Sequence, residues 1–237
     1  MPFWKFLSQS EAHPARYDSP KAFLVVAGGV SLLESEARRA GLSALAKSPT
    51  IRLARQGGLR AHEASGQDIA SLHPRLAQVS GLLALASASE ACISAGWCHR
   101  VLLDTRWKAT HLASFTDWRT RRLLTANVAC RPIEKLKKPA DRVLAAAILT
   151  GELMEYAAGP TGALQSFAPS LNALQSAGAK GCTPLRHLLA ISAAVYDTLS
   201  VTRVVGMPAV EQKAARWQPS YCSSALSTPV VMPTNPT

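Results

Sequence analysis

DRVLAAAILTGELMEYAA, residues 141–158, is the stretch that predicts the fold most clearly. Its apolar side chains recur at intervals of three and four residues, which is the period of a helix that buries one face. Asp141 follows Pro139 and can cap the first turn, and Gly159-Pro160 can end the helix. The stretch therefore predicts one long amphipathic helix.

Glu152 and Glu155 lie one turn apart near the end of this predicted helix. Residues three apart lie near the same helix face, so the two carboxylates could hold a divalent cation. A solvated helix face carries the same pattern, and it is the interpretation we favour from the sequence.

Four more helices are predicted, because the same period appears elsewhere in the chain. Three of them cover residues 34–45, 68–96 and 161–177. The fourth starts at Thr183-Pro184, where threonine can cap the helix and proline suits its first position. Strand-like alternation is scarce, so the sequence predicts a mostly α fold.

Three short segments are expected to depart from this helical pattern. Residues 22–33 are expected to form a buried strand or the entry to a helix, and residues 201–207 are the best candidate for a short strand. Gly57-Gly58 is expected to break the chain.

The composition predicts one main helical domain. Of the 237 residues, 48% are hydrophobic and 17% are charged, which is typical of a globular protein. The helical domain is expected to cover residues 21–217. A loose arm at residues 1–20 and a disordered tail rich in Ser, Thr and Pro at residues 218–237 are expected to flank it.

The cysteines form an odd set without a CxxC pair; they are Cys92, Cys98, Cys130, Cys182 and Cys222. Neither a disulfide framework nor a zinc ribbon is indicated, so a reducing cytoplasm is the expected location. The apolar run at residues 22–33 is too short to cross a bilayer, which needs about 20 residues. No membrane span is therefore predicted.

No catalytic constellation is evident in the sequence. The six histidines are scattered, and the sequence has no phosphate-binding loop, nucleophile elbow or HExxH motif. Cys98-His99 could be imagined as an activated thiol or, with Cys92, as three metal ligands, but neighbours on a helix point apart. We therefore predict no catalytic residue, no bound metal and no cofactor.

The net charge of +11 is concentrated in residues 100–142. This segment holds eleven Arg or Lys and four Asp or Glu, so it carries seven of the eleven excess positive charges. Such a balance favours a polyanionic partner. Trp107 and Trp118 lie among these cations, and single-stranded nucleic acid is often held by base stacking combined with phosphate neutralisation.

The predicted contacts to nucleic acid are Trp107, Trp118, Arg119, Arg121, Arg122, Lys135, Lys137 and Lys138. A solvated basic face with tryptophans in the core would produce the same pattern. A second function also stays open, that of a helical adaptor whose basic face binds an acidic protein partner.

Residues 82–96, LLALASASEACISAG, carry a Ser-Glu pair, Ser89-Glu90, after an apolar helical stretch. In this the chain resembles the N-terminal domain of TraI-type conjugation proteins, the MOBH relaxases, over residues 30–158. In that family the Ser-Glu pair precedes three histidines. The resemblance implies an α-helical fold of the HD type, whose histidines and His-Asp pair hold metal for cutting DNA at the transfer origin.

The family's histidine positions read Cys92-Ile93-Ser94 in this chain, and Met154-Glu155 stands where the His-Asp pair would lie. Methionine is a soft, weak ligand and cannot replace imidazole on a hard divalent ion. The resemblance therefore implies a degenerate HD-like bundle, a non-catalytic DNA-associated protein of conjugative or mobile elements. Nucleic acid and proteins of the conjugation apparatus would be its partners. An HD-like nuclease or phosphohydrolase with unusual ligands is a third hypothesis.

Overall fold

Helices make up most of the chain that the structure describes. The computed structural model describes residues 20–128, 136–155, 164, 166–178 and 182–204, and these contain no β-strand. The predicted mostly α fold is confirmed. The predicted N-terminal arm and C-terminal tail, residues 1–20 and 218–237, lie outside the described residues apart from Pro20.

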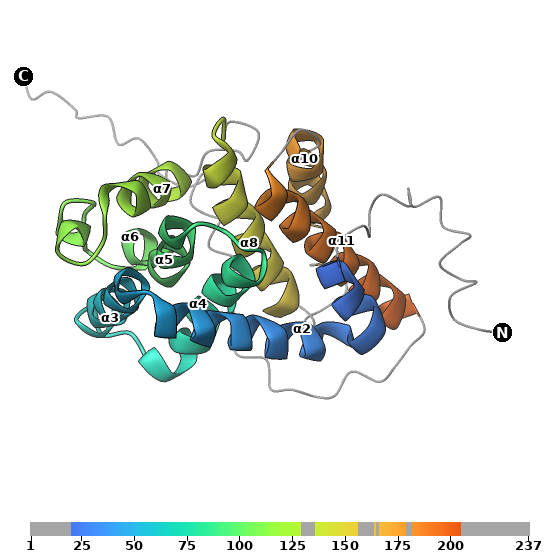
Figure 1. Cartoon of the computed structure of the whole chain (residues 1–237), viewed down its shortest axis with the longest axis horizontal. Coiled ribbons are helices and arrows are strands. Elements are labelled where there is room, and N and C mark those ends of the chain that lie inside the picture. The colour runs from blue at the N-terminus through green and yellow to red at the C-terminus, as the bar shows by residue number, and fades with distance from the viewer. Residues whose placement is uncertain (1–19, 129–135, 156–163, 165, 179–181, 205–237) are drawn as a thin grey trace, which may run out of the picture.

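Figure 1 shows the elements in chain order by colour. They are α2 (Pro20–Lys47), α3 (Pro49–Glu63), α4 (Ile69–Leu85), α5 (Glu90–Cys98), α6 (Val101–Asp104), the 3₁₀ turn η2 (His111–Ser114), α7 (Trp118–Val128), α8 (Pro139–Glu155), α10 (Ala168–Gly178) and α11 (Thr183–Val204). The helices predicted at residues 141–158 and from Thr183 are therefore present, the first as far as it is described.

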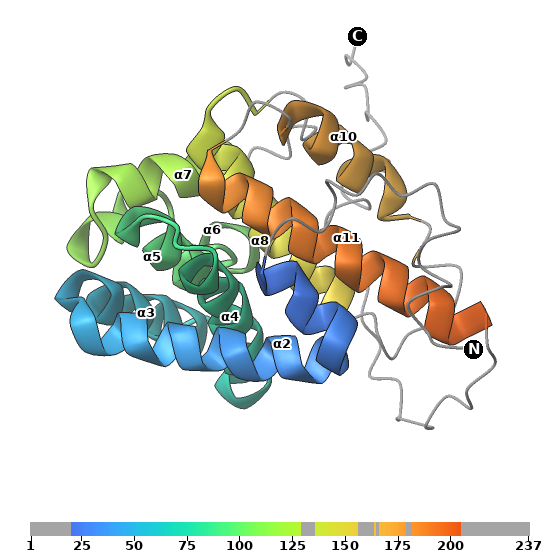
Figure 2. The same cartoon turned by 45° about the vertical axis from the view of Figure 1, so that its right-hand side comes forward.

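Helices α4, α5 and α8 lie at the centre of the bundle. Helix α2 packs along α4, α3 packs on α5, and α7 contacts both α5 and α8. Figure 2 shows α11 lying across α8 and beside the start of α2. Apolar side chains from all these elements meet in one continuous core, which includes Leu76, Leu124, Leu144 and Leu185.

Two glycines let α2 and α4 approach closely. A Cβ on Gly41 would lie 3.3 Å from Gly81 Cα, and a Cβ on Gly81 would lie 2.4 Å from the carbonyl oxygen of Ala37. A side chain at Gly81 would force the helices apart, since the clash is with backbone. This contact fixes how α2 lies on α4.

The single helix predicted at residues 68–96 is wrong, because the structure divides it into α4 and α5. Helix α4 ends at Leu85, and Ser87 has a positive φ of 59°. Ser89 then caps α5, its hydroxyl accepting a hydrogen bond from the Cys92 amide at 3.4 Å. The Ser-Glu pair therefore begins a helix, since a serine hydroxyl offers the amides of a first turn an acceptor.

Gly57 and Gly58 do not break the chain, contrary to the prediction; both are buried inside α3. A Cβ on Gly57 would lie 2.0 Å from Phe115 Cγ, and one on Gly58 would lie 2.8 Å from the carbonyl oxygen of Trp97. These glycines serve close packing, and their cost in helix propensity is of order 1 kcal/mol each.

The remaining expectations are met in part. Residues 22–33 are helical and belong to α2, which bends at Gly29, where φ is 71°. The strand expected at residues 201–207 is not formed in its described part, because residues 201–204 continue α11. Helix α10 begins later than residue 161, after a turn at residues 166–167. Of the helices that the structure describes, none is both long and apolar enough to cross a membrane.

Candidate nucleic-acid interface

Helix α7 carries four of the predicted contact residues, Trp118, Arg119, Arg121 and Arg122, and its inner face is fixed against the core. Asp117 caps the helix, accepting a hydrogen bond from the Thr120 amide at 2.6 Å. The Thr120 hydroxyl donates to the carbonyl of Ala91 on α5 at 3.3 Å, and Leu123 and Leu124 are buried. With this face fixed against the core, Trp118 and Arg119 at other positions of the first turn point outward, and both are exposed.

Trp118 is the most informative residue on that outer face. It is the first residue of α7, and 62% of its surface is exposed. The guanidinium carbon of Arg119 lies 5.5 Å from the centroid of its ring, within the range of a cation–π interaction. An exposed aromatic face beside a cation therefore marks the start of α7.

Arg121 and Arg122 follow on α7, but Arg122 has a second role. Its Nη1 donates to Asp141 Oδ2 on α8 at 3.4 Å. Its Nη2 lies 3.2 Å from Oδ1, an ion-pair contact rather than a hydrogen bond. The Asp141 side chain is only 7% exposed, so Arg122 compensates a buried charge. Arg121 is partly exposed.

Lys137 and Lys138 lie directly before α8. Both are exposed, while Leu136 beside them is buried. The backbone here is held by Arg142, whose Nε donates to the carbonyl of Leu136 at 2.6 Å. Lys135 lies outside the described residues.

Trp107 differs from Trp118 in its exposure to solvent. It is partly buried, and its ring packs against Phe115 and His111 with centroid distances of 5.8 Å in both cases. Its backbone amide bonds to the Thr105 hydroxyl at 3.1 Å. The structure thus gives Trp107 a packing role at the edge of the core.

Few acidic side chains accompany the basic ones in this part of the chain. In the described residues 117–142 there are six basic side chains and two acidic ones, Asp117 and Asp141. Asp117 is used as a helix cap and Asp141 as the partner of Arg122. We call Trp118, Arg119, Arg121, Lys137 and Lys138 the basic interface.

Cys98 and His99, which could be imagined from the sequence as an activated thiol, each contact a backbone carbonyl. Cys98 Sγ donates to the carbonyl of Ala54 at 3.3 Å, and His99 Nδ1 lies 2.8 Å from the carbonyl of Gly96. Burial raises the pKa of Cys98 to about 12 and lowers the pKa of His99 to about 4. A thiolate–imidazolium pair is not formed, because both groups are neutral near pH 7.

The prediction that Glu152 and Glu155 lie on a solvated face is wrong. Both are partly buried, and Glu155 Oε2 lies 3.6 Å from Arg75 Nε on α4. Burial, with a smaller effect of the Glu155 charge, raises the pKa of Glu152 to about 7. Burial also raises the pKa of Glu155. Sequence periodicity missed this because α8 is covered on more than one side.

Four residues that the sequence resemblance would align with metal ligands lie in the core. Cys92, Ile93 and Ser94 are buried on α5, and Met154 is buried on α8. Among the described residues there is no group of three His, Cys, Asp or Glu side chains placed to hold a metal ion.

Sequence reasoning did not single out Arg55, His73 and Trp97. These residues lie on α3, α4 and α5, and the structure brings them together. Their sequence separations carry no motif that would have found them. Residue type alone, a tryptophan in a short apolar helix, gave no sign of a site.

Comparisons with known proteins give no relative. No protein-family model, curated protein or solved structure matches this sequence.

Proposed function

We propose that this protein binds single-stranded nucleic acid through the basic interface and has no catalytic activity of its own. The observation that carries the proposal is the exposed indole of Trp118 with the guanidinium of Arg119 beside it. A large aromatic side chain is costly to leave in water, and here it lies among cations. A base can stack on the ring while the cations contact phosphates.

Single strands are favoured over duplex for a geometric reason. Trp118 is on the first turn of α7, and its ring is available only to a base that is not already stacked on both sides. Arg119 lies beside the ring. Lys137 and Lys138 add exposed positive charge directly before α8, the helix to which Arg122 of α7 is paired. Phosphate contacts of this kind make binding salt-dependent.

The association with conjugative or mobile DNA remains part of the proposal, and it is supported by the sequence resemblance to MOBH relaxases. Burial of Cys92, Ile93 and Ser94 is compatible with a non-catalytic relative. Proteins of the conjugation apparatus are the proposed further partners, in a cytoplasmic setting.

A competition binding experiment distinguishes this proposal from the adaptor hypothesis. Labelled oligothymidylate is bound to the protein, and unlabelled oligothymidylate or polyglutamate of similar total charge is added. The proposal expects displacement by the oligonucleotide at much lower concentration, because polyglutamate offers no base to stack on Trp118. Equal displacement by both would favour an acidic protein partner.

A further inference from the structure

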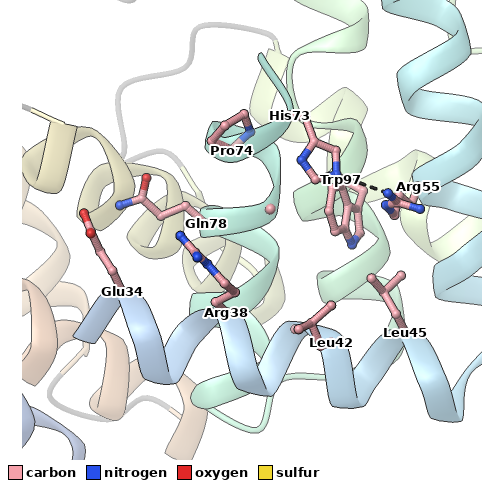
Figure 3. A pocket seen from close by; sticks show the side chains of 11 residues that line it. Glu34, Arg38, Leu42, Leu45, Arg55, His73, Pro74, Gln78 and Trp97 are labelled. Atoms are coloured by element: carbon pink, nitrogen blue, oxygen red, sulfur yellow. Dashed lines mark hydrogen bonds between the residues drawn. The ribbon is translucent and has the colours of Figure 1, made fainter. Parts of the chain in front are cut away.

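A cavity of about 580 Å³ lies on a different part of the molecule from the basic interface. Helices α2 and α4 form its sides, and Arg55 of α3 and Trp97 of α5 close one end (Figure 3). Its size is within the range of small-molecule pockets. No residue of the basic interface lines it.

The closed end of the cavity is built from three packed side chains. The rings of His73 and Trp97 lie 5.6 Å apart, and the guanidinium carbon of Arg55 lies 5.5 Å from the Trp97 ring centroid. Arg55 Nη2 lies 3.2 Å from His73 Nε2. Because a guanidinium only donates, His73 Nε2 accepts this bond and the ring is neutral. Burial and the Arg55 charge accordingly lower the pKa of His73.

Two N–H groups at this end have no acceptor. Arg55 Nε and Trp97 Nε1 are both buried and make no hydrogen bond in the structure. Trp97 is 2% exposed, so its indole cannot turn to bulk water. Buried donors are nearly always paired, since an unpaired donor costs stability. Both donors belong to side chains that line this end of the cavity, where each lacks an acceptor.

The rest of the cavity is largely apolar. Leu42 and Leu45 of α2 and Pro74 and Ala77 of α4 line it. Figure 3 shows Leu42 and Leu45 on the α2 side of Trp97, and Leu42 is 62% exposed. An apolar body of a ligand would be covered by these four side chains.

Charge also distinguishes the two ends. Arg55 lies at the Trp97 end of the cavity, whereas Glu34 and Gln78 lie towards the other end (Figure 3). Arg38 lies on α2 between Glu34 and Leu42. The lining carries two arginines and one carboxylate, so it favours an anion over a cation.

We propose that this cavity binds a small organic anion, a carboxylate on an apolar body. The carboxylate accepts hydrogen bonds from Arg55 Nε and Trp97 Nε1, and the apolar body packs on Leu42, Leu45 and Ala77. A carboxylate has two oxygens and can accept from both donors at once. Inorganic phosphate is disfavoured because it would leave the apolar walls uncovered.

The test uses two matched pairs of probes, phenylpropionate with phenylpropanol and octanoate with octanol, added to the full chain. Binding is followed by calorimetry and by the ¹⁵N-detected indole resonances, with Trp97 assigned by Trp97→Phe. At least one carboxylate should bind at a single site and move the Trp97 Nε1 resonance. Its alcohol should bind at least about tenfold more weakly, because a charged acceptor is lost.

Variants separate the cavity from the rest of the surface. Arg55→Met should weaken carboxylate binding at least about tenfold, whereas Arg60→Met, an exposed arginine of the same helix, should leave it unchanged. If Arg55→Met does not fold, Arg38→Gln changes an exposed lining residue and should weaken binding several-fold. The inference is overturned if neither carboxylate binds, if alcohols bind equally well, or if binding leaves the Trp97 resonance in place.

Discussion

The guanidinium of Arg122 on α7 faces the buried carboxylate of Asp141 on α8, with Nη2 and Oδ1 3.2 Å apart. This ion pair attaches the helix that carries Trp118 to a central helix of the bundle. The arginines of α7 therefore differ in role. Arg122 stabilises the fold, whereas Arg119 lies beside the exposed indole of Trp118.

We therefore expect Arg122→Ala to destabilise the protein by about 1–3 kcal/mol, the usual cost of a buried polar group left without its partner, here the Asp141 carboxylate. Arg119→Ala should change the free energy of unfolding by less than about 0.5 kcal/mol, as is usual for an exposed residue. Urea unfolding of both variants measures the difference. Equal stabilities would show that the ion pair contributes nothing to the fold.

Gly57→Ala tests the close contact between α3 and the segment around Phe115. The added Cβ would lie 2.0 Å from Phe115 Cγ, so either the ring or the helix must move. We expect a loss of about 1–3 kcal/mol of stability, the usual cost of overpacking. Gln56→Ala, at an exposed position of α3, is the control and should be within about 0.5 kcal/mol of the parent.

A double variant shows whether the clash is the cause. Phe115→Ala removes the ring that the new methyl group meets, so Gly57→Ala should cost less in that background than in the parent. Additive losses would mean that Gly57 is needed for another reason.

Glu152 makes stability depend on pH. Burial raises its pKa from 4.5 to about 7, so the folded protein keeps this proton when the unfolded chain has lost it. Between these two pH values unfolding releases the proton of Glu152, so the contribution of this residue to the free energy of unfolding falls as pH rises. Above about pH 7 this contribution has been lost in full, which lowers the free energy of unfolding by about 1–3 kcal/mol.

Glu152→Gln should remove this pH dependence and make the protein more stable than the parent at pH 8. Thermal or urea unfolding across pH 4 to 8 measures it. Glu63→Gln, an exposed carboxylate on α3 whose substitution removes the same charge, should leave the slope unchanged. Buried His99 contributes a slope of the opposite sign, so the quantity compared is the difference in free energy of unfolding between the parent and Glu152→Gln. A difference that does not change with pH would contradict the assignment to Glu152.

Local sequence signals predicted the parts of the fold that local physics decides. The proline after Thr183 and the apolar period of residues 141–158 mark the start of α11 and the course of α8, but Thr183 and Asp141 lie inside their helices rather than at the cap positions predicted for them. The division between α4 and α5 was missed because it depends on one serine cap at Ser89 and a positive φ at Ser87. Neither the cap nor the positive φ changes the spacing of the apolar residues, so periodicity could not predict the break.

Tertiary contacts decide the features that the sequence could not predict. Gly57 lies in a helix because Phe115, far along the chain, occupies the space of its missing side chain. Trp107 and Trp118 look alike in the sequence, and only packing shows that the first is partly buried and the second exposed. The meeting of Arg55 with Trp97 likewise depends on how α3 crosses α5.

The most direct test of the central claim is the affinity of Trp118→Ala for labelled oligothymidylate, measured by fluorescence anisotropy at low and moderate salt. The account predicts that the parent binds in a salt-dependent way and that the variant binds about 5-fold to 150-fold more weakly, the loss of one stacked base. Leu53→Ala, which removes an exposed apolar side chain on α3, should bind like the parent. No binding by the parent at low salt, or equal affinities of Trp118→Ala and the parent, would contradict the account.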